Sequence, residues 1–445
     1  MKKRLISLAL ATLVGVTSLV GCSKKVDTNA PLEITFWHSM GGKGGEALSS
    51  LVEKFNNSQD EIIVSAEYQG TYSDSVNKLK SSMIGNAGPD VVQLYDIGTK
   101  WMIDSEYSMT IQEFIDEENY DISQLEENIL DYYSVDGTLY SMPFNTSTPI
   151  LYYNKDAFRE VGLDPEITPK TFDEIIEYSE KLVKKNGQTV ERYGFAMQVY
   201  GWLFEEFLSK QGLTYMNNSD GRDGNPTAVE FDSNGGALTI FEGWKKLVDS
   251  GVVGNFGRSG DNTTDAFVSG TSAMMVSSTA SLANIKNKID GSFELGTAYI
   301  PAVNDDGNGG VSIGGASLWI IDNKDDENRE KANATFEFIK FLVSAESQAE
   351  WAAKTGYFPV TKAAYDLEEM QEHLENNPEF RTAINQLRES DNRPGALLGI
   401  FPEARAAVEE NLEKLLNNEI TAEEAVQNSA DKINKSLSKY NRYNN

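Results

Sequence analysis

The chain has 445 residues, a formal net charge of −29 at pH 7 and a single cysteine. At roughly 150 residues per domain this length predicts two or three domains, and the acidic excess argues against binding to nucleic acid or to anionic lipid surfaces. One cysteine excludes an intramolecular disulfide and a cysteine metal cluster, so burial has to stabilise the fold.

The N-terminus has the layout of a secretory signal. Cationic residues at positions 2–4 precede an apolar run over 5–20, which is shorter than the about 20 residues of a membrane-spanning helix. The tetrad Leu19-Val20-Gly21-Cys22 resembles a bacterial lipobox, which implies cleavage before Cys22 and lipid attachment to its thiol. We predict a signal peptide over 1–21, a polar tether over 22–30 and an extracytoplasmic domain anchored to the cell membrane through Cys22. A plain secretory signal with an incidental thiol is the alternative.

Strands and helices alternate after the tether. Apolar runs predict strands at 32–37, 62–64 and 90–95. A helical stretch covers 73–84, and an earlier helix is indicated by apolar residues that recur at helical spacing: Ala47, Leu48, Leu51, Val52 and Phe55. This alternation predicts an α/β sheet with helices on both faces.

The second half repeats this pattern. Residues 149–153 read as a strand, and Thr171-Phe172-Asp173-Glu174 matches a capping box at the start of a helix. Thr421-Ala422-Glu423-Glu424 is a second capping box, and it opens an amphipathic C-terminal helix.

The chemical inventory gives little support to catalysis. His38 and His373 are the only histidines, and neither lies in a nucleophile-elbow context. His38 ends the first predicted strand, where packing or a hydrogen bond is expected, and His373 is expected to be an exposed helical residue. The glycine pairs match neither a P-loop nor a dinucleotide fingerprint. We predict no enzyme, no cofactor and no metal site; an exported glycosidase or phosphodiesterase is a remote alternative, because spacing cannot reveal a carboxylate pair.

Tyrosine, tryptophan, serine and glycine stand at the ends of the predicted strands and helices. Open α/β sheets bind ligands beyond the carboxyl ends of their strands, where helix N-termini suit anions and aromatic faces suit sugar or glycerol backbones. Filling of the core is the alternative for any one aromatic. A structural surface lipoprotein is disfavoured, because the chain has no repeats or long stalk.

Five segments together resemble the sn-glycerol-3-phosphate-binding proteins of bacterial ABC importers, in order from about Ile34 to the C-terminal helix. The segments are Phe36–Met40, Pro143–Pro149, Leu151–Phe158, Gly314–Trp319 and Lys354–Tyr357. The resemblance implies an α/β, two-lobed periplasmic-binding fold whose lobes are joined by crossing hinge segments, with the ligand cleft between them. Lobe one is expected to comprise 30–148 and 312–358, and lobe two 149–311 and 359–445.

The resemblance also implies ligand-binding residues. The family's site falls on hydroxyl side chains and a close-approach glycine that this chain keeps: Tyr72, Ser147, Ser278, Gly315 and Tyr357. The hydroxyls can donate to phosphate oxygens, and a glycine leaves its amide open to the ligand. The family's glutamate, which accepts from glycerol hydroxyls, is the shorter Asp96 here.

The sequence departs from the family at two positions. The family's stacking tryptophan aligns with Val199, and its phosphate-pairing arginine aligns with Leu397. Loss of a bidentate arginine favours a less charged head group. Nearby candidates for compensation are Arg393 and Arg405 for the arginine, and Tyr200 and Trp202 for the stack.

We therefore expect a monomeric extracytoplasmic solute-binding subunit that delivers a small polar solute to ABC permease subunits. Its expected ligand is sn-glycerol-3-phosphate or a glycerophosphodiester such as glycerophosphocholine, bound by hinge closure. A mono- or oligosaccharide is the alternative ligand.

Overall fold

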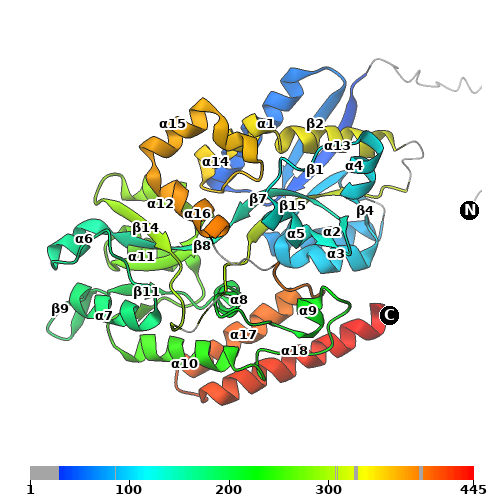
Figure 1. The fold of residues 1–445 in the computed structure, drawn as a ribbon. Helices are drawn as coiled ribbons and strands as arrows, with labels where there is room; N and C mark the ends of the chain where they lie inside the picture. Colours follow the sequence, from blue (N-terminus) through cyan, green and yellow to red (C-terminus); the bar gives the residue numbers. More distant parts are fainter. Residues whose placement is uncertain are drawn as a thin grey trace, which may run out of the picture.

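The computed structural model describes residues 30–85, 87–305, 307, 309–324, 329–389 and 394–444. The predicted signal, Cys22 and the tether up to residue 29 lie outside the described residues. Figure 1 shows two groups of strands and helices, one at the upper right and one at the lower left, with α10, α17 and α18 along the lower edge. This is the expected α/β architecture of two lobes.

The first sheet has the strand order β2-β1-β3-β15-β4, and β7 also pairs with β15. β1 is parallel to β2 and β3, whereas β15 runs antiparallel to β3, β4 and β7. The strands are β1 (Leu32–His38), β2 (Ile62–Tyr68), β3 (Val91–Tyr95), β4 (Ser108–Met109), β7 (Met142–Ser147) and β15 (Gly314–Ile321). Every residue of β3 and β7 is buried, as expected of strands covered on both faces.

Helices cover this first sheet. α1 buries the five apolar residues whose spacing predicted it, from Ala47 to Phe55. The helices are α1 (Gly42–Ser58), α2 (Tyr72–Met83), η1 (Asp96–Gly98), α3 (Thr99–Ser105), α4 (Ile111–Glu118), α5 (Glu127–Tyr133), α13 (Glu330–Leu342) and α14 (Ala345–Thr355); a small hairpin of β5 (Ser134–Val135) and β6 (Thr138–Leu139) follows α5.

The second sheet has the order β12-β11-β13-β8-β14. Its strands are β8 (Pro149–Asn154), β11 (Phe195–Met197), β12 (Val253–Asn255), β13 (Met274–Ser278) and β14 (Leu295–Tyr299); β9 (Lys184–Asn186) and β10 (Thr189–Arg192) form a separate hairpin. The helices before β15 are α6 (Lys155–Glu160), α7 (Phe172–Leu182), α8 (Gly201–Lys210), α9 (Asn217–Gly221), α10 (Gly236–Asp249), α11 (Gly260–Val268), η2 (Thr279–Ser281) and α12 (Leu282–Ile289). The later ones are η3 (Lys362–Asp366), α15 (Glu368–Asn376), η4 (Pro378–Phe380), α16 (Arg381–Glu389), α17 (Phe401–Leu416) and α18 (Ala422–Asn444).

The chain crosses between the sheets more than once. Thr148 alone separates β7 of the first sheet from β8 of the second. The chain returns between β14 and β15, and α16 later contacts β8 and β14 again. These crossings put the ends of both sheets close together, while the residue limits of the two lobes stay a prediction.

Of the two capping boxes predicted at helix starts, one is confirmed and one is only half formed. The Thr421 hydroxyl accepts from the Glu424 N–H at 3.2 Å and the Glu424 carboxylate accepts from the Thr421 N–H at 2.9 Å, so this capping box is confirmed. Thr171 accepts from the Glu174 N–H at 3.2 Å, but the Glu174 carboxylate accepts from the Lys170 N–H instead, which makes the predicted box there only half right.

The two histidines are both structural. His38 is buried, and its Nδ1 accepts from the Met40 N–H at 3.3 Å, as expected for packing and a hydrogen bond. The prediction that His373 is exposed was wrong, because its ring is half-buried and packs edge-on against Phe380 with 4.6 Å between centroids.

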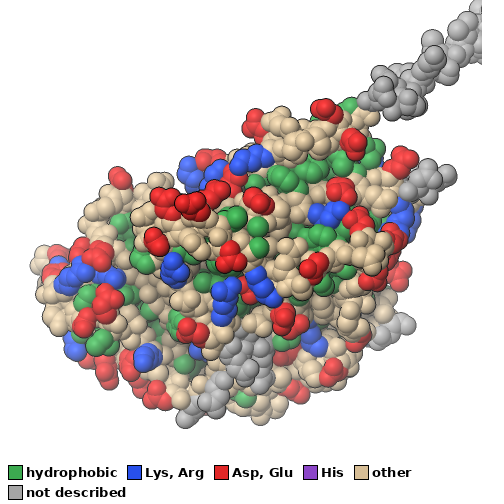
Figure 2. Space-filling model, turned by 45° about the horizontal axis from the view of Figure 1, so that its top comes forward, with side chains coloured by type: hydrophobic (Ala, Val, Ile, Leu, Met, Phe, Trp, Pro, Cys, Tyr) green, Lys and Arg blue, Asp and Glu red, His purple; other side chains and the backbone are tan. Residues whose placement is uncertain are grey.

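Acidic and basic side chains are interspersed on the face drawn in Figure 2, with apolar side chains between them. This mixture is typical of a solvated surface. Across the described part of the chain, no helix combines the length and the apolar character that crossing a membrane requires.

Candidate functional site

Hydroxyl groups from distant segments meet at one end of the first sheet. Tyr72 begins α2, and its ring stacks on Tyr95 with 5.4 Å between centroids and 13° between planes. Its hydroxyl accepts a hydrogen bond from Asn145 Nδ2 at 3.0 Å, and the Tyr357 hydroxyl bonds to both of these side chains. Burial raises the pKa of Tyr72 and of Tyr357. Both phenols therefore keep their protons at neutral pH and can serve as donors.

Ser147 and Gly315 lie on paired strands beside this cluster. Ser147 pairs with Gly314, and Gly315 pairs with Thr146 in the β7–β15 ladder. Gly315 has a φ of +117°, and a Cβ there would lie 1.9 Å from the backbone oxygen of Asn145. Only glycine fits this conformation and this close approach.

Ser278 reaches the same region from the second sheet. It ends β13 and caps η2, its Oγ accepting from the Ala280 N–H at 3.2 Å. The Thr279 N–H donates to the Thr148 oxygen at 3.0 Å, and the Thr148 N–H donates to Thr279 Oγ1 at 3.3 Å. Because Thr148 follows Ser147 directly, the structure brings the segments of these two serines together.

Asp96 lies in η1 just after β3, and its carboxylate is buried. Arg405 Nη2 donates to Asp96 Oδ2 at 3.2 Å, and its Nε and Nη2 donate to the two Glu205 carboxylate oxygens at 2.6 and 2.8 Å. Burial raises the pKa of Asp96, and the Arg405 guanidinium offsets part of that rise. The same two causes act on the pKa of Glu205, which is raised. One guanidinium thus serves two carboxylates, the buried Asp96 and the largely buried Glu205.

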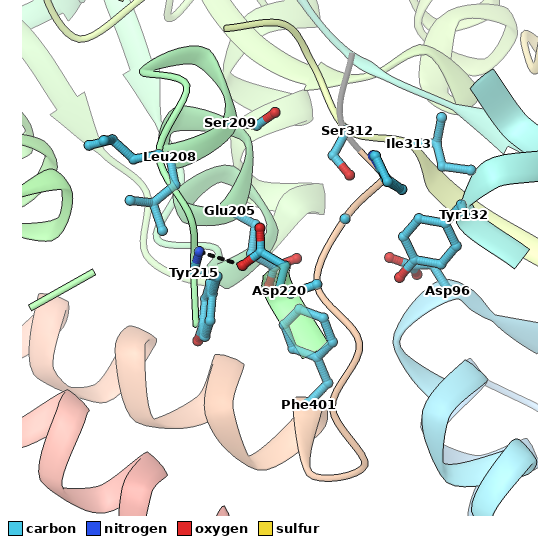
Figure 3. Close-up of a pocket in the computed structure, with 14 residues that line it drawn as sticks. Asp96, Tyr132, Glu205, Leu208, Ser209, Tyr215, Asp220, Ser312, Ile313 and Phe401 are labelled. Atoms are coloured by element: carbon cyan, nitrogen blue, oxygen red, sulfur yellow. Dashed lines mark hydrogen bonds between the residues drawn. The ribbon is translucent and has the colours of Figure 1, made fainter. Parts of the chain in front are cut away.

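A narrow cavity of about 30 Å³ lies beside Asp96. Figure 3 shows Glu205 and Asp220 on one side of this space and Asp96 and Tyr132 on the other. The described residues that line it are Asp96, Tyr132, Glu205, Leu208, Ser209, Leu213, Tyr215, Asp220, Ser312, Ile313, Pro394, Gly395, Ala396 and Phe401. Carboxylates, hydroxyls and aromatic rings from segments far apart in the chain therefore face one narrow space.

The aromatic candidates for a stacking role are placed differently. Val199 is fully buried and offers no stacking face. Trp202 is buried against the start of β15, where a Cβ at Gly314 would come within 2.8 Å of its ring, and its Nε1 has no hydrogen-bond partner among the described residues. Tyr200 lies next to it, with 6.0 Å between ring centroids. Neither Trp202 nor Tyr200 lines the cavity beside Asp96.

The cationic candidates differ as well. Leu397 is buried, and its N–H donates to the Asp220 oxygen at 2.8 Å. Arg393 lies outside the described residues. Arg405, a candidate for compensating the arginine missing at Leu397, donates to the Asp96 and Glu205 carboxylates, so its guanidinium is already occupied.

Several residues of the candidate site were missed by the sequence analysis. Asn145 lies inside the family-like segment 143–149 and could have been picked from it. Glu205, Tyr132 and Ser209 reach the cavity only through contacts between segments far apart in the chain. Among the described residues, no group of three or more potential ligand side chains could hold a metal ion.

Residues 50–382 match the family of bacterial extracellular solute-binding proteins. The chain belongs to this family, and it is an extracytoplasmic solute-binding subunit of an ABC importer. Over 95% of its length it is 34% identical to the sn-glycerol-3-phosphate-binding periplasmic protein UgpB of Escherichia coli K12, 95% of which is covered. The resemblance seen in the five sequence segments is thereby confirmed.

Solved structures agree on the fold. UgpB from Mycobacterium tuberculosis in complex with glycerophosphocholine superposes with a TM-score of 0.77 at 22% identity, covering 92% of this chain and 99% of that one. The acarbose-binding GacH receptor of Streptomyces glaucescens gives a TM-score of 0.77 at 20% identity, with the same coverage. The sugar-binding protein MalE of Xanthomonas citri gives 0.74 at 21% identity, covering 92% and 98%. These likenesses confirm the two-lobed fold.

Proposed function

We propose that the protein binds sn-glycerol-3-phosphate or a glycerophosphodiester such as glycerophosphocholine between its lobes and delivers it to the permease. The observation that carries the proposal is the hydroxyl cluster of Tyr72, Tyr357 and Asn145 beside Ser147 and the Gly315 backbone. Neutral donors of this kind hold phosphate oxygens by hydrogen bonds. The similarity to UgpB over nearly the whole chain supports the same ligand class.

A diester fits this site better than a phosphate monoester. A phosphate monoester is a dianion and calls for a cation in the site. The position of the family's phosphate-pairing arginine holds Leu397 here, and the Arg405 guanidinium already binds two carboxylates. A diester carries a single negative charge, which several neutral donors can stabilise. We expect glycerophosphocholine to bind more tightly than sn-glycerol-3-phosphate.

A mono- or oligosaccharide is the second candidate. The cavity beside Asp96 combines carboxylates with the rings of Tyr132, Tyr215 and Phe401, and carboxylates accept from sugar hydroxyls while ring faces pack on sugars. Several structural relatives carry sugars in their names.

Isothermal titration calorimetry on residues 23–445 tests the proposal. The ligands are sn-glycerol-3-phosphate, glycerophosphocholine and maltotriose, and a ligand that binds only the folded state also raises the melting temperature. Binding of a glycerol phosphate that weakens about tenfold in Ser147→Ala supports the assignment. Tyr299→Phe, which removes an exposed tyrosine hydroxyl that bonds to Glu389, is the control. Binding of maltotriose but of neither glycerol phosphate would contradict the proposal and identify the ligand as a saccharide.

The mechanism we propose is binding without turnover. Ligand contacts on both lobes shift the population toward a closed form, and the closed form docks on the permease. Incubation of the protein with a bound glycerophosphodiester should leave the diester intact by phosphorus NMR. Release of free glycerol phosphate would show an enzyme instead.

The lipid anchor on Cys22 and the monomeric state are further parts of the proposal. Metabolic labelling with palmitate should mark the wild-type protein but not Cys22→Ser, and the labelled protein should sediment with membranes. Light scattering on residues 23–445 should give the mass of one chain.

A further inference from the structure

The Asp96–Arg405–Glu205 group connects elements of the two lobes. Asp96 follows β3 of the first sheet. Arg405 and Glu205 lie on α17 and α8, and these helices pack against each other on the side of the second sheet. Asp96 and Arg405 are 309 residues apart in sequence, so the packing of the two lobes against each other brings them together.

The guanidinium is held rigidly from its own lobe. Its two bonds to Glu205, at 2.6 and 2.8 Å, form a bidentate fork, and the Phe401 ring lies 5.4 Å from its centre. Arg405 is only 8% exposed. The third bond, to Asp96, is therefore made by a group that is already oriented and largely shielded from water.

Asp96 needs such a partner, because its carboxylate is buried. It is 7% exposed, and burial raises its pKa while Arg405 pulls the pKa down. Glu205 shares the same cation, and the negative charge of Asp96 raises the pKa of Glu205.

We propose that Arg405 is a positioning residue of the ligand site, which fixes the Asp96 carboxylate toward the ligand's hydroxyl groups when the lobes close. This rests on the proposed function, because it takes Asp96 as the group that accepts from those hydroxyls. Glu205 orients the Arg405 guanidinium through its two hydrogen bonds and so determines how strongly Arg405 binds the Asp96 carboxylate.

Two variants with opposite expected effects test the proposal. In Arg405→Met, Asp96 loses its cation, so we expect glycerophosphocholine affinity at pH 7.5 to fall about tenfold and to begin its acid decline at higher pH than in the wild type. In Glu205→Gln, Arg405 is shared with one carboxylate fewer, so the acid decline should begin at lower pH. Calorimetry from pH 5 to pH 8 measures both.

Arg258, in the loop before α11, provides a matched control. Arg258 also contacts two carboxylates of α17, Glu409 and Glu413, but its side chain is 40% exposed. Arg258→Met should bind the ligand as the wild type does at every pH. A purely structural Arg405 would alter the melting temperature without moving the pH profile.

The outcomes separate the two proposals. If wild-type protein binds glycerophosphocholine but Arg405→Met and Glu205→Gln keep its pH profile, the positioning role is wrong and the proposed function stands. If Arg405→Met does not fold, an unchanged profile in Glu205→Gln alone overturns the role. If the wild type binds no glycerol phosphate, the proposed function itself fails.

Discussion

At the scale of single residues, Gly315 is a strict requirement of the backbone. Gly315→Ala combines a φ of +117° with a Cβ 1.9 Å from the Asn145 oxygen. We expect the free energy of unfolding in urea to fall by about 3 kcal/mol or more. Gly137→Ala is the control, because Gly137 has a φ of +75° but open space around it, and its cost should be about 1 kcal/mol. Equal losses in the two variants would contradict the close contact.

His38 gives a residue-scale prediction on pH. Burial lowers its pKa to about 4, from 6.5 in an unfolded chain. Between these two pH values the unfolded state binds more protons than the folded state. The contribution of neutral His38 to the free energy of unfolding is therefore complete above pH 6.5 and is lost as the pH falls toward 4. The loss amounts to about 3 kcal/mol.

The measurement for His38 is the free energy of unfolding from pH 7 to pH 4. His38→Gln keeps an acceptor for the Met40 N–H but cannot be protonated, so its stability should decline less steeply than that of the wild type. Parallel curves would mean that His38 takes up a proton without loss of stability.

At the scale of elements, Arg222 joins α9 to α5. Its Nη1 donates to the backbone oxygens of Asp131, Tyr132 and Ser134 at 3.0–3.3 Å, where α5 ends, and its Nε and Nη2 donate to the Gly395 oxygen at 3.1 and 2.7 Å. A cation at a helix C-terminus also interacts favourably with the helix dipole. This one side chain therefore fixes three segments around the cavity.

We expect Arg222→Ala to lower the free energy of unfolding by about 2–3 kcal/mol, because buried carbonyl oxygens lose a charged donor. Urea unfolding measures it, and hydrogen exchange should show earlier opening of α5. Arg258→Ala, which removes an exposed arginine, should cost less than about 1 kcal/mol. Similar costs for the two arginines would argue against the clamp.

Elements with local signals could be predicted, and contacts between them could not. The spacing of Ala47 to Phe55 and the capping box at Thr421 act within a few turns of chain, and both are confirmed. Arg405 and Glu205 are charged residues on amphipathic helices, where a solvated face is the usual reading. They are buried because two helices and η1 pack together, which no spacing in the sequence reveals.

At the scale of the whole molecule, the two-lobed arrangement could be predicted from the resemblance to the solute-binding family but not from the periodicity of apolar residues. Alternating strands and helices predict an α/β sheet but not two sheets joined by several crossings. The proposed ligand site likewise draws on both sheets, since the Thr148–Thr279 contact joins the segments of Ser147 and Ser278. Family motifs located the hydroxyl residues, while the cavity lining depends on tertiary packing.

Contacts between the lobes should set how far the free protein opens. Figure 1 shows α18 running along the lower edge to the C-terminus below α3. There the Tyr440 hydroxyl donates to Asp104 Oδ2 at 2.8 Å, which links the last helix to the first lobe. A hydrogen bond of this kind, to a charged acceptor, contributes about 1.5–3 kcal/mol, which is enough to shift a balance between open and closed forms.

We therefore expect Tyr440→Phe to open the ligand-free protein and to weaken ligand binding several-fold, because ligand then has to drive more of the closure. Small-angle scattering should give a radius of gyration of about 22 Å for the closed, ligand-bound form and a larger value for the ligand-free variant. Tyr299→Phe removes the same type of bond, to Glu389 at 2.6 Å, between β14 and α16, which pack on each other in the second lobe. It should leave both the radius and the affinity unchanged, and an equal effect of the two variants would mean that Tyr440 stabilises the fold without biasing closure.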